Sequence, residues 1–230
     1  MRFALIMNSN AYAGREYLKA LNNAGLMVDV LNIGEFPEIN SNEEDRCGGL
    51  WQPPKESYLE RTFDFFHFQS LSDEKFISFL DEKKYDVCIQ GGTGILKLNV
   101  IKKFTQGILN FHPGNLPQYR GCSAPEWQLY ENNDVYCTCH LIDEGIDTGN
   151  IYCAKKLDVS HDSYEHFRAS VYPEVSKFVV EVVGKVILTK KIVCVPQEEN
   201  LAVYRKYIGL EKIAELRRRL DTRYLTINDL

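Results

Sequence analysis

The chain has 230 residues, 44% of them hydrophobic and 26% charged, and this is the composition of a globular protein that forms its own core. Its net charge of −5 disfavours a nucleic-acid partner, because proteins that bind phosphate backbones present basic surfaces. Since no apolar run approaches the roughly 20 residues that cross a bilayer and the amino terminus lacks a signal-peptide pattern, we expect a soluble, cytoplasmic protein without a membrane partner.

The first part of the chain predicts a β-α-β unit. Residues 2–7 are a short, almost continuous apolar run, which is typical of a strand buried on both faces. Residues 14–24 place apolar side chains at helical spacing, and residues 26–33 indicate a second strand. Two strands joined by a helix favour a parallel sheet.

Residues 35–73 are less regular and hold an aromatic patch from Phe63 to Phe68. We expect a long surface excursion here rather than a second domain. A helix is predicted over residues 72–83, with Ser72 as the candidate N-cap and acidic residues in the first turn.

The rest of the chain continues the alternation of strands and helices. Strands are predicted over 86–90, 107–110, 135–142, 149–154 and 192–195, and helices over 98–104, 124–130, 163–184 and 210–220. Pro173 predicts a kink or break inside the longest of these helices. The alternation predicts an α/β fold with a Rossmann-like, mostly parallel open sheet flanked by helices. We divide the chain into a main domain over residues 1–185 and a small C-terminal extension, with a short strand and a helix, over 186–230.

The cysteines do not indicate a disulfide framework, because the seven of them are scattered and form no CxxC pair. The run from Cys137 to His140 is similar to a metal-ligand cluster. However, Cys137 and Cys139 alternate within a predicted strand, and a zinc site would need a second ligand pair. We interpret these cysteines as buried thiols and expect no metal.

The most informative polar residues are Asn110 and His112, which lie two apart at the end of an apolar strand and therefore share one face. Ligands of open parallel sheets bind beyond the carboxyl ends of the strands, so this face is expected to look into a crevice. The acidic loop at residues 142–149 brings Asp147, which is able to accept a hydrogen bond from His112 and to stabilise its protonated form. These groups favour acyl or formyl transfer, with Asn110 and His112 stabilising an oxyanion. The alternative is a capped strand followed by an acidic turn that binds nothing.

Two sequence motifs resemble the signatures of the folate-dependent N-formyltransferases. Residues 110–121 read Asn-Phe-His-Pro-Gly-Asn-Leu-Pro-Gln-Tyr-Arg-Gly, which is similar to that family's Asn-x-His-Pro followed by Leu-Pro-x-Tyr/Phe-Arg-Gly. Residues 140–149 are similar to its second signature. Both motifs occur in the family's order and at its separation, and the resemblance is close over residues 86 to about 152. It implies that residues 1–185 are a formyltransferase catalytic domain.

The resemblance also implies a catalytic triad of Asn110, His112 and Asp147, with 10-formyltetrahydrofolate as the formyl donor. The acceptor amine would attack the formyl carbon, and Asn110 and protonated His112 would stabilise the tetrahedral oxyanion. Asp147 would keep His112 charged and help to relay a proton. A pterin pocket is implied between the turn at residues 91–96 and the loop at 142–147. The implied cofactor-binding residues are Gly94, Leu96, Asp143, Glu144 and Asp147.

Three acceptors are compatible with the family: an amino-sugar nucleotide, glycinamide ribonucleotide and methionyl-tRNA. The net charge of −5 and the few residues after the second motif oppose tRNA, whose enzymes carry a further C-terminal domain. The glycinamide ribonucleotide enzymes bind the substrate phosphate with a Gly-x-Gly-Ser-Asn loop. At the equivalent place, residues 7–12 of this chain keep Ser9-Asn10 but lack both glycines. The run Tyr119-Arg120-Gly121 followed by Trp127 is more similar to the sugar-nucleotide and tRNA branches. We therefore expect a nucleotide-linked amino sugar, with glycinamide ribonucleotide or another small amine as the alternative.

The aromatic residues between positions 47 and 68 have two interpretations. Aromatic faces stack on nucleobases, so they would help to hold the acceptor. The ordinary interpretation is that they pack this segment onto the sheet. The resemblance to the sugar-modifying branch is also compatible with a homodimer, although no stretch of the sequence marks an interface.

Overall fold

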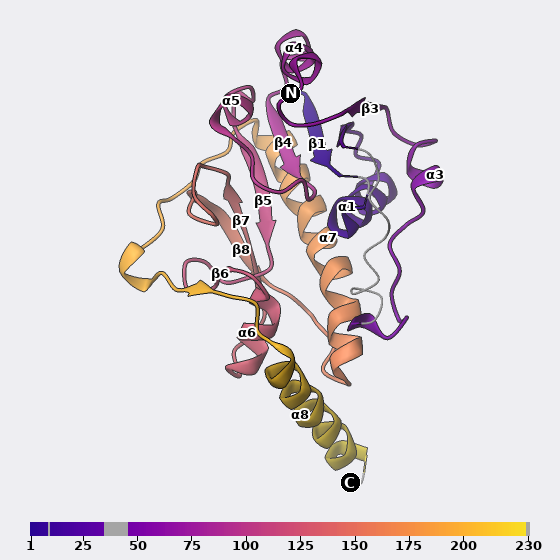
Figure 1. Cartoon of the computed structure of the whole chain (residues 1–230), viewed down its shortest axis with the longest axis vertical. Helices are drawn as coiled ribbons and strands as arrows, with labels where there is room; N and C mark the ends of the chain where they lie inside the picture. Colours follow the sequence, from indigo (N-terminus) through magenta and orange to yellow (C-terminus); the bar gives the residue numbers. More distant parts are fainter. Residues whose placement is uncertain (9, 35–45, 229–230) are drawn as a thin grey trace.

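The computed structural model describes residues 1–8, 10–34 and 46–228, and its centre is a seven-stranded sheet with the order β3-β2-β1-β4-β5-β7-β8 (Figure 1). Its strands are β1 (Phe3–Met7), β2 (Asp29–Ile33), β3 (Phe65–Phe68), β4 (Val87–Gln90), β5 (Ile108–His112), β7 (Tyr136–Leu141) and β8 (Ile151–Lys156). The first five strands in that order pair in parallel, whereas β7 and β8 are antiparallel. The predicted α/β fold with a mostly parallel open sheet is therefore confirmed.

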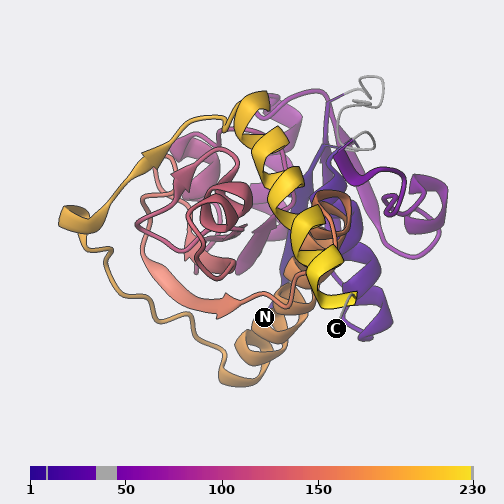
Figure 2. The same ribbon diagram turned by 90° about the horizontal axis from the view of Figure 1, so that it is seen from below.

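Helices cover both faces of this sheet (Figures 1 and 2). The helices are α1 (Tyr12–Asn23), α3 (Glu56–Leu59), α4 (Glu74–Lys83), α5 (Leu98–Ile101), α6 (Ala124–Tyr130), α7 (Tyr164–Thr189) and α8 (Leu210–Asn228). Residues of α1 and α7 pack into one hydrophobic cluster, and residues of α4 and α5 pack into another. None of the helices in the described part of the chain combines the length and the hydropathy needed to cross a bilayer.

Strand β1 shows why the sequence runs continuously apolar at this point. Phe3, Leu5 and Met7 belong to the cluster that holds α1 and α7, while Ala4 and Ile6 belong to the cluster of α4 and α5. Successive side chains of a strand point to opposite faces, so a strand with helices on both faces buries all of them. All five residues of β1 are buried, as predicted.

Part of the predicted surface excursion belongs to the sheet instead. The aromatic patch forms β3, the edge strand that pairs in parallel with β2. Phe66 and Phe68 pack against Phe79 of α4, with ring centroids 4.6 and 5.2 Å apart. The patch is thus a short strand held by side-chain packing, while residues 35–45 of the predicted excursion lie outside the described residues.

The predicted N-cap of α4 is wrong, and of the kink or break predicted at Pro173 the break does not occur. Helix α4 is capped by Asp73, whose side chain accepts a hydrogen bond from the Lys75 amide, rather than by Ser72. Helix α7 runs without a break through Pro173. A proline costs an interior helix roughly 3 kcal/mol. The burial of Val171 and Val175 on either side of it offsets this cost.

The chain after α7 differs from the predicted strand and helix, and part of it pairs with the first motif. The described residues 192–195 make one bridge, from Val195 to Ile151, in place of the predicted strand, and α8 is longer than predicted. A short strand, β9 (Tyr204–Arg205), follows the 3-10 helix η1 (Glu199–Leu201) and pairs in parallel with β6 (Arg120–Gly121). Helix α8 then packs against α6 and α7 (Figure 2).

Four of the seven cysteines are buried, Cys153 and Cys194 are partly buried, and Cys122 is exposed. All seven are free, and Cys137 and Cys139 are fully buried in β7. Burial raises the pKa of both thiols well above its ordinary value, so they are neutral at physiological pH.

Candidate active site

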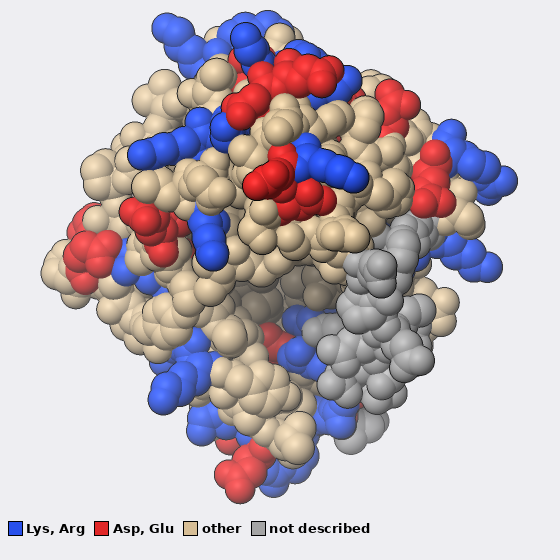
Figure 3. Space-filling view, turned by 45° about the horizontal axis from the view of Figure 1, so that its top comes forward, with Lys and Arg blue, Asp and Glu red and all other residues tan. Residues whose placement is uncertain are grey.

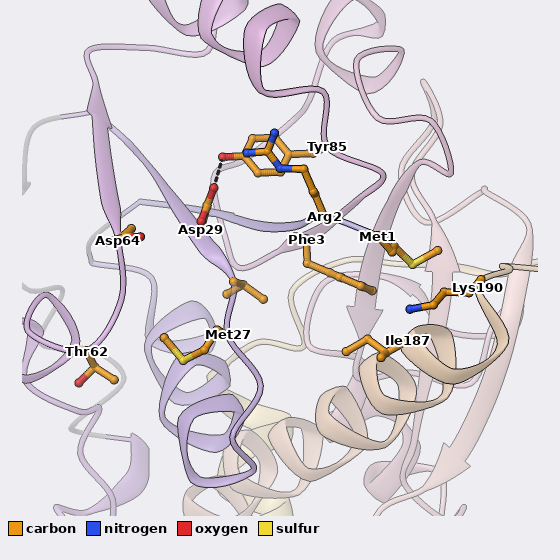
Figure 4. Close-up of a pocket in the computed structure, with 11 residues that line it drawn as sticks. Met1, Arg2, Phe3, Met27, Asp29, Thr62, Asp64, Tyr85, Ile187 and Lys190 are labelled. Atoms are coloured by element: carbon orange, nitrogen blue, oxygen red, sulfur yellow. Dashed lines mark hydrogen bonds between the residues drawn. The ribbon is translucent and has the colours of Figure 1, made fainter.

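Two cavities lie at opposite edges of the sheet, and the larger, of about 380 Å³, lies at the amino-terminal ends of β1 and β2 (Figure 4). Its polar side chains interact with one another: the Tyr85 hydroxyl donates to Asp29 at 2.6 Å, and the Arg2 guanidinium lies 5.3 Å from the centroid of the Tyr85 ring. None of the predicted site residues lines it. Because ligands of such sheets bind at the carboxyl ends of the strands, we place the candidate site at the other edge.

At that edge, the antiparallel pairing of β5 with β7 brings Asn110 opposite His140. The Asn110 Nδ2 atom lies 3.1 Å from His140 Nε2. The other imidazole nitrogen, Nδ1, lies 2.8 Å from the Leu141 carbonyl oxygen and therefore carries the proton. With this tautomer, His140 Nε2 accepts a hydrogen bond from the Asn110 carboxamide and fixes its orientation.

Asp147 lies between the two histidines. Its Oδ2 is 3.5 Å from His112 Nδ1, and its Oδ1 is 3.7 Å from His140 Nε2. Oδ2 also accepts a hydrogen bond of 2.9 Å from the Gly121 amide. Burial raises the pKa of Asp147, but the contacts with His140, His112 and Gly121 outweigh burial and bring it below its ordinary value. The carboxyl group is therefore ionised at neutral pH.

His112 is 6% exposed, and its ring is held by a 2.6 Å hydrogen bond from Nε2 to the Tyr119 carbonyl. Burial lowers the pKa of His112 below its ordinary value, and this effect exceeds the opposing effects of Asp147 and of the Tyr119 carbonyl. Burial thus favours the neutral form of His112, and its protonated form during the reaction stays a prediction. A neutral His112 with its proton on Nε2 presents the lone pair of Nδ1 to the Asp147 side.

The smaller cavity, of about 120 Å³, lies beside these groups between the turn after β4 and the loop after β7. It is lined by Gln90, Gly94, Ile95, Leu96, Asn110, His140, Ile142, Asp143, Gly145, Ile146 and Asp147. Four of the five residues implied for the donor therefore line it, whereas Glu144 is exposed and does not. His112 does not line it either but contacts Asp147, which does.

The turn after β4 has a shape that requires glycine. Gly94 has a φ of +82°, which a side chain would make unfavourable. The Gln90 side chain donates to the Gly94 carbonyl at 3.0 Å and accepts from the Thr93 hydroxyl at 3.0 Å. These bonds hold the turn as one wall of the cavity.

The loop between β5 and α6 is held by Gln128, whose side chain is fully buried. Its Oε1 accepts hydrogen bonds of 3.0 Å from the amides of Asn115 and Tyr136. Its Nε2 donates to the carbonyls of Pro113 and Ala124 at 3.1 and 3.2 Å. This single side chain therefore holds Pro113 and Asn115 of the first motif against α6 and β7.

We expect Gln128→Leu to destabilise the protein by about 3 kcal/mol or more, because it leaves several buried backbone groups without partners at roughly 1–3 kcal/mol each. Chemical denaturation monitored by circular dichroism measures this loss. Gln52→Leu, at an exposed position, is the matched control and should stay within about 0.5 kcal/mol of the parent. Equal stability of the two variants would contradict the role assigned to Gln128.

The described aromatic residues between positions 47 and 68 pack against the body of the protein. Trp51 stacks on Tyr172 of α7 with centroids 4.9 Å apart, and its edge meets Tyr12 of α1 at 5.9 Å. Its indole nitrogen donates to Glu16 at 3.3 Å, and Phe63 is buried in the core. These contacts favour the packing interpretation over a surface for stacking a nucleobase.

The site thus combines a carboxamide, two imidazoles and a carboxylate beside a cavity at the carboxyl edge of an α/β sheet, an arrangement typical of group-transfer enzymes. Residues 1–183 match the family model described as formyl transferase. The chain belongs to this family.

Known proteins similar to this chain differ in their acceptors. The methionyl-tRNA formyltransferase of Myxococcus xanthus is 27% identical over 150 residues, which are 63% of this chain and 47% of the relative. The chain spans about half the length of the curated relatives that it matches first. A phosphoribosylglycinamide formyltransferase from Streptococcus pneumoniae has a TM-score of 0.59 at 18% identity, covering 81% of this chain and 98% of that one.

The formyltransferase PseJ from Anoxybacillus kamchatkensis has a TM-score of 0.55 at 20% identity, covering 84% of this chain and 94% of its own. Its structure is a complex with UDP-4,6-dideoxy-4-formamido-L-AltNAc and tetrahydrofolate. At these identities the likeness to the solved structures shows a shared fold.

Proposed function

We propose that the protein transfers a formyl group from 10-formyltetrahydrofolate to the amine of a nucleotide-linked amino sugar. The observation that carries the reaction type is the convergence of Asn110, His112 and Asp147 beside one cavity, in a chain of the formyl transferase family. The ligands of PseJ, tetrahydrofolate and a formylated UDP-sugar, support the same donor and acceptor classes here.

The smaller cavity fits the flat end of the donor. Its walls are formed by residues of the 94–96 turn and of the 142–147 loop, among them the apolar residues Leu96 and Ile142. Sites for whole drug-sized ligands have volumes of about 300–1,000 Å³, so a cavity of about 120 Å³ accommodates a ring system and leaves the rest of the molecule outside. When bound, the donor supplies the formyl carbon that accepts the amine.

The chain's own residues then have distinct tasks. The Asn110 carboxamide, oriented by His140, donates its second N–H to the oxygen on which negative charge develops. Asp147 lines the cavity and its carboxylate lies 3.5 Å from His112 Nδ1, so we assign to it the relay of a proton from the amine to Nδ1 of His112. The bond between the formyl carbon and the folate nitrogen then breaks, and the proton on His112 returns by way of Asp147 to this nitrogen, so that tetrahydrofolate leaves. The Tyr119 carbonyl keeps the His112 ring in place during both proton transfers.

This assignment predicts the pH dependence of kcat/KM. Only neutral His112 accepts a proton, so kcat/KM should rise with pH as His112 loses its proton and then level off. Because burial lowers the pKa of His112, the midpoint should lie below the ordinary histidine value of about 6.5. The measurement is a kcat/KM profile from about pH 5 to 9 with two acceptors whose amines have different pKa values. If the acid limb reports His112, its midpoint is the same with both acceptors. A midpoint above about 7 with both acceptors would contradict it.

The loop after β1 supports an acceptor other than glycinamide ribonucleotide. The Asn8 amide donates to the Gly92 carbonyl at 2.9 Å, and the Ala11 amide donates to the Asn8 carbonyl at 2.7 Å. The Asn10 amide donates to the Asn8 side chain at 3.0 Å. These amides are engaged within the loop instead of cradling a phosphate, while Ser9 lies outside the described residues.

Charge supports a small, polar acceptor. The net charge of −5 disfavours a tRNA, whose binding relies on an excess of basic side chains. The surface has a hollow with both basic and acidic side chains at its floor (Figure 3). A nucleotide-linked amino sugar carries both anionic and cationic groups and suits such a surface.

The proposal is tested by incubating the purified protein with 10-formyltetrahydrofolate and each of four acceptor types: UDP-linked amino sugars, dTDP-linked amino sugars, glycinamide ribonucleotide and methionyl-tRNA. Release of tetrahydrofolate and the mass of the formylated acceptor are measured together. Turnover with a sugar nucleotide is expected. Turnover with glycinamide ribonucleotide or methionyl-tRNA alone would overturn the proposed acceptor, and formylation of none of the four would overturn the proposed function.

A further inference from the structure

The segment that follows α7 contacts both motif loops through one side chain, Gln197. Its Nε2 donates to the Asp147 carbonyl at 2.9 Å and to the Gly149 carbonyl at 2.8 Å. Its Oε1 accepts from Arg120 Nε at 3.0 Å and from Arg120 Nη2 at 2.7 Å. A single carboxamide therefore joins the loop that carries Asp147 to the loop of the first motif.

Arg120 makes this connection firm. It is 6% exposed, and its guanidinium forms two further hydrogen bonds with the Glu199 carboxylate, at 2.6 and 3.0 Å. The next residue, Gly121, donates its amide to the Asp147 side chain. A closed ring of contacts thus runs from the Asp147 carboxylate through Gly121, Arg120 and Gln197 back to the Asp147 backbone.

Asp147 depends on such support because of its backbone. Its φ is +57°, in the left-handed region that residues with a side chain avoid. Gln197 bonds the Asp147 carbonyl and the carbonyl of Gly149, two residues later, and so fixes the backbone from which the Asp147 carboxylate projects. A change of about 1 Å in the position of a reacting group costs a large factor in rate.

We infer that Gln197 is a positioning residue that, together with Arg120, holds Asp147 against His112. Gln197 lies beyond residues 1–183, the part of the chain that matches the family model, and it belongs to neither motif. The kinetic consequences of this inference rest on the proposed formyl transfer, whereas its structural consequences do not.

The kinetic test compares Gln197→Met with Gln106→Met. Methionine keeps the length of glutamine but forms none of its hydrogen bonds. Gln106 is a matched control, because it also bridges the segment after α7, to the Lys190 carbonyl at 3.2 Å and the Ile192 amide at 3.1 Å, and it is not a residue of the site. We expect Gln197→Met to lower kcat by about 10- to 100-fold with KM for both substrates nearly unchanged, and Gln106→Met to leave kcat nearly unchanged. Equal kcat in the two variants would overturn the inference.

A pH profile separates positioning from a general structural role. Among the described residues, the titratable groups close to Asp147 are His112, His140 and Tyr204, and those acting on His112 are Asp147 and His140. When Asp147 moves away from His112, the loss of its negative charge disfavours the imidazolium, so the acid limb of kcat/KM should move to lower pH in Gln197→Met. A lower kcat with an unmoved acid limb would overturn the inference. Gln197→Glu keeps an acceptor for Arg120 but faces two carbonyls without a donor, so it should remain impaired, and its full activity would count against the role of these bonds.

Hydrogen–deuterium exchange tests the same inference without any turnover. The Gly121 amide is held by Asp147, so a peptide containing it should exchange faster in Gln197→Met than in the parent or in Gln106→Met. Unchanged exchange of this peptide would overturn the inference even if activity were lost. Absence of formyl transfer by the parent protein would instead overturn the proposed function and leave the exchange result to decide on Gln197.

Discussion

His112→Gln is expected to lower kcat/KM for formyl transfer by about 10²- to 10⁴-fold, the range over which a positioned acid–base group contributes. The glutamine amide still donates to the Tyr119 carbonyl, which His112 Nε2 contacts at 2.6 Å, so the loop keeps its anchor. It has no basic nitrogen in place of Nδ1, next to Asp147, and therefore accepts no proton from the amine. Steady-state kinetics with the acceptor found in the panel measures the loss.

A second histidine provides the control for this substitution. His161 is exposed and lies outside the site, so His161→Gln should keep kcat/KM within about twofold of the parent. Thermal unfolding of both variants shows whether the buried substitution affects folding as well. A folded His112→Gln protein that keeps more than about a tenth of the parent's kcat/KM would show that His112 is not the proton acceptor.

The sequence predicts those elements of the fold that depend on the pattern of neighbouring apolar residues. The continuous apolar run of β1 is dictated by burial on both faces, and its pairing with β2 follows from the intervening helix. Strand β3 was missed because Phe65–Phe68 is a short aromatic run in an irregular segment, and its place at the sheet edge depends on packing against α4. The continuity of α7 through Pro173 is a tertiary effect of the same kind.

The residues of the candidate site also differ in whether a local sequence rule places them. Asn110 and His112 share a face because they lie two residues apart in one strand, which is a local rule. His140 lies beside Asn110 because of the antiparallel register between β5 and β7, which no short-range pattern specifies. The one available signal was the alternation of side chains along β7. Cys137 and Cys139 are buried on one face, so His140 lies on the other.

The charge of His112 could not be predicted from its neighbours in the sequence. A nearby Asp147 alone favours the imidazolium, as does the Tyr119 carbonyl. Burial acts in the opposite direction and depends on everything packed around the ring, so only the folded structure shows which effect is larger. In the same way, the contact of Gln197 with the Asp147 loop joins parts of the chain that lie fifty residues apart.

Asn110→Asp provides the second decisive test, because it changes the electrostatics of the site with almost no change in shape. It replaces the Nδ2 donor by an oxygen that repels the developing oxyanion, and it removes the hydrogen bond to His140 Nε2. Removal of one such donor typically costs about 10²- to 10³-fold in kcat, and we expect a loss of this size.

The same substitution distinguishes stabilisation of the transition state from simple binding. The oxyanion is absent when only tetrahydrofolate is bound, so the Kd of tetrahydrofolate, measured by calorimetry, should change far less than kcat. Asn99→Asp introduces the same change at an exposed position of α5 and should leave both quantities near the parent values. If tetrahydrofolate affinity fell by the same factor as kcat, Asn110 would be a binding residue and the oxyanion role would be wrong. A large loss of kcat with retained affinity places the Asn110 donor at the reacting oxygen, where His140 and the register of β5 with β7 hold it.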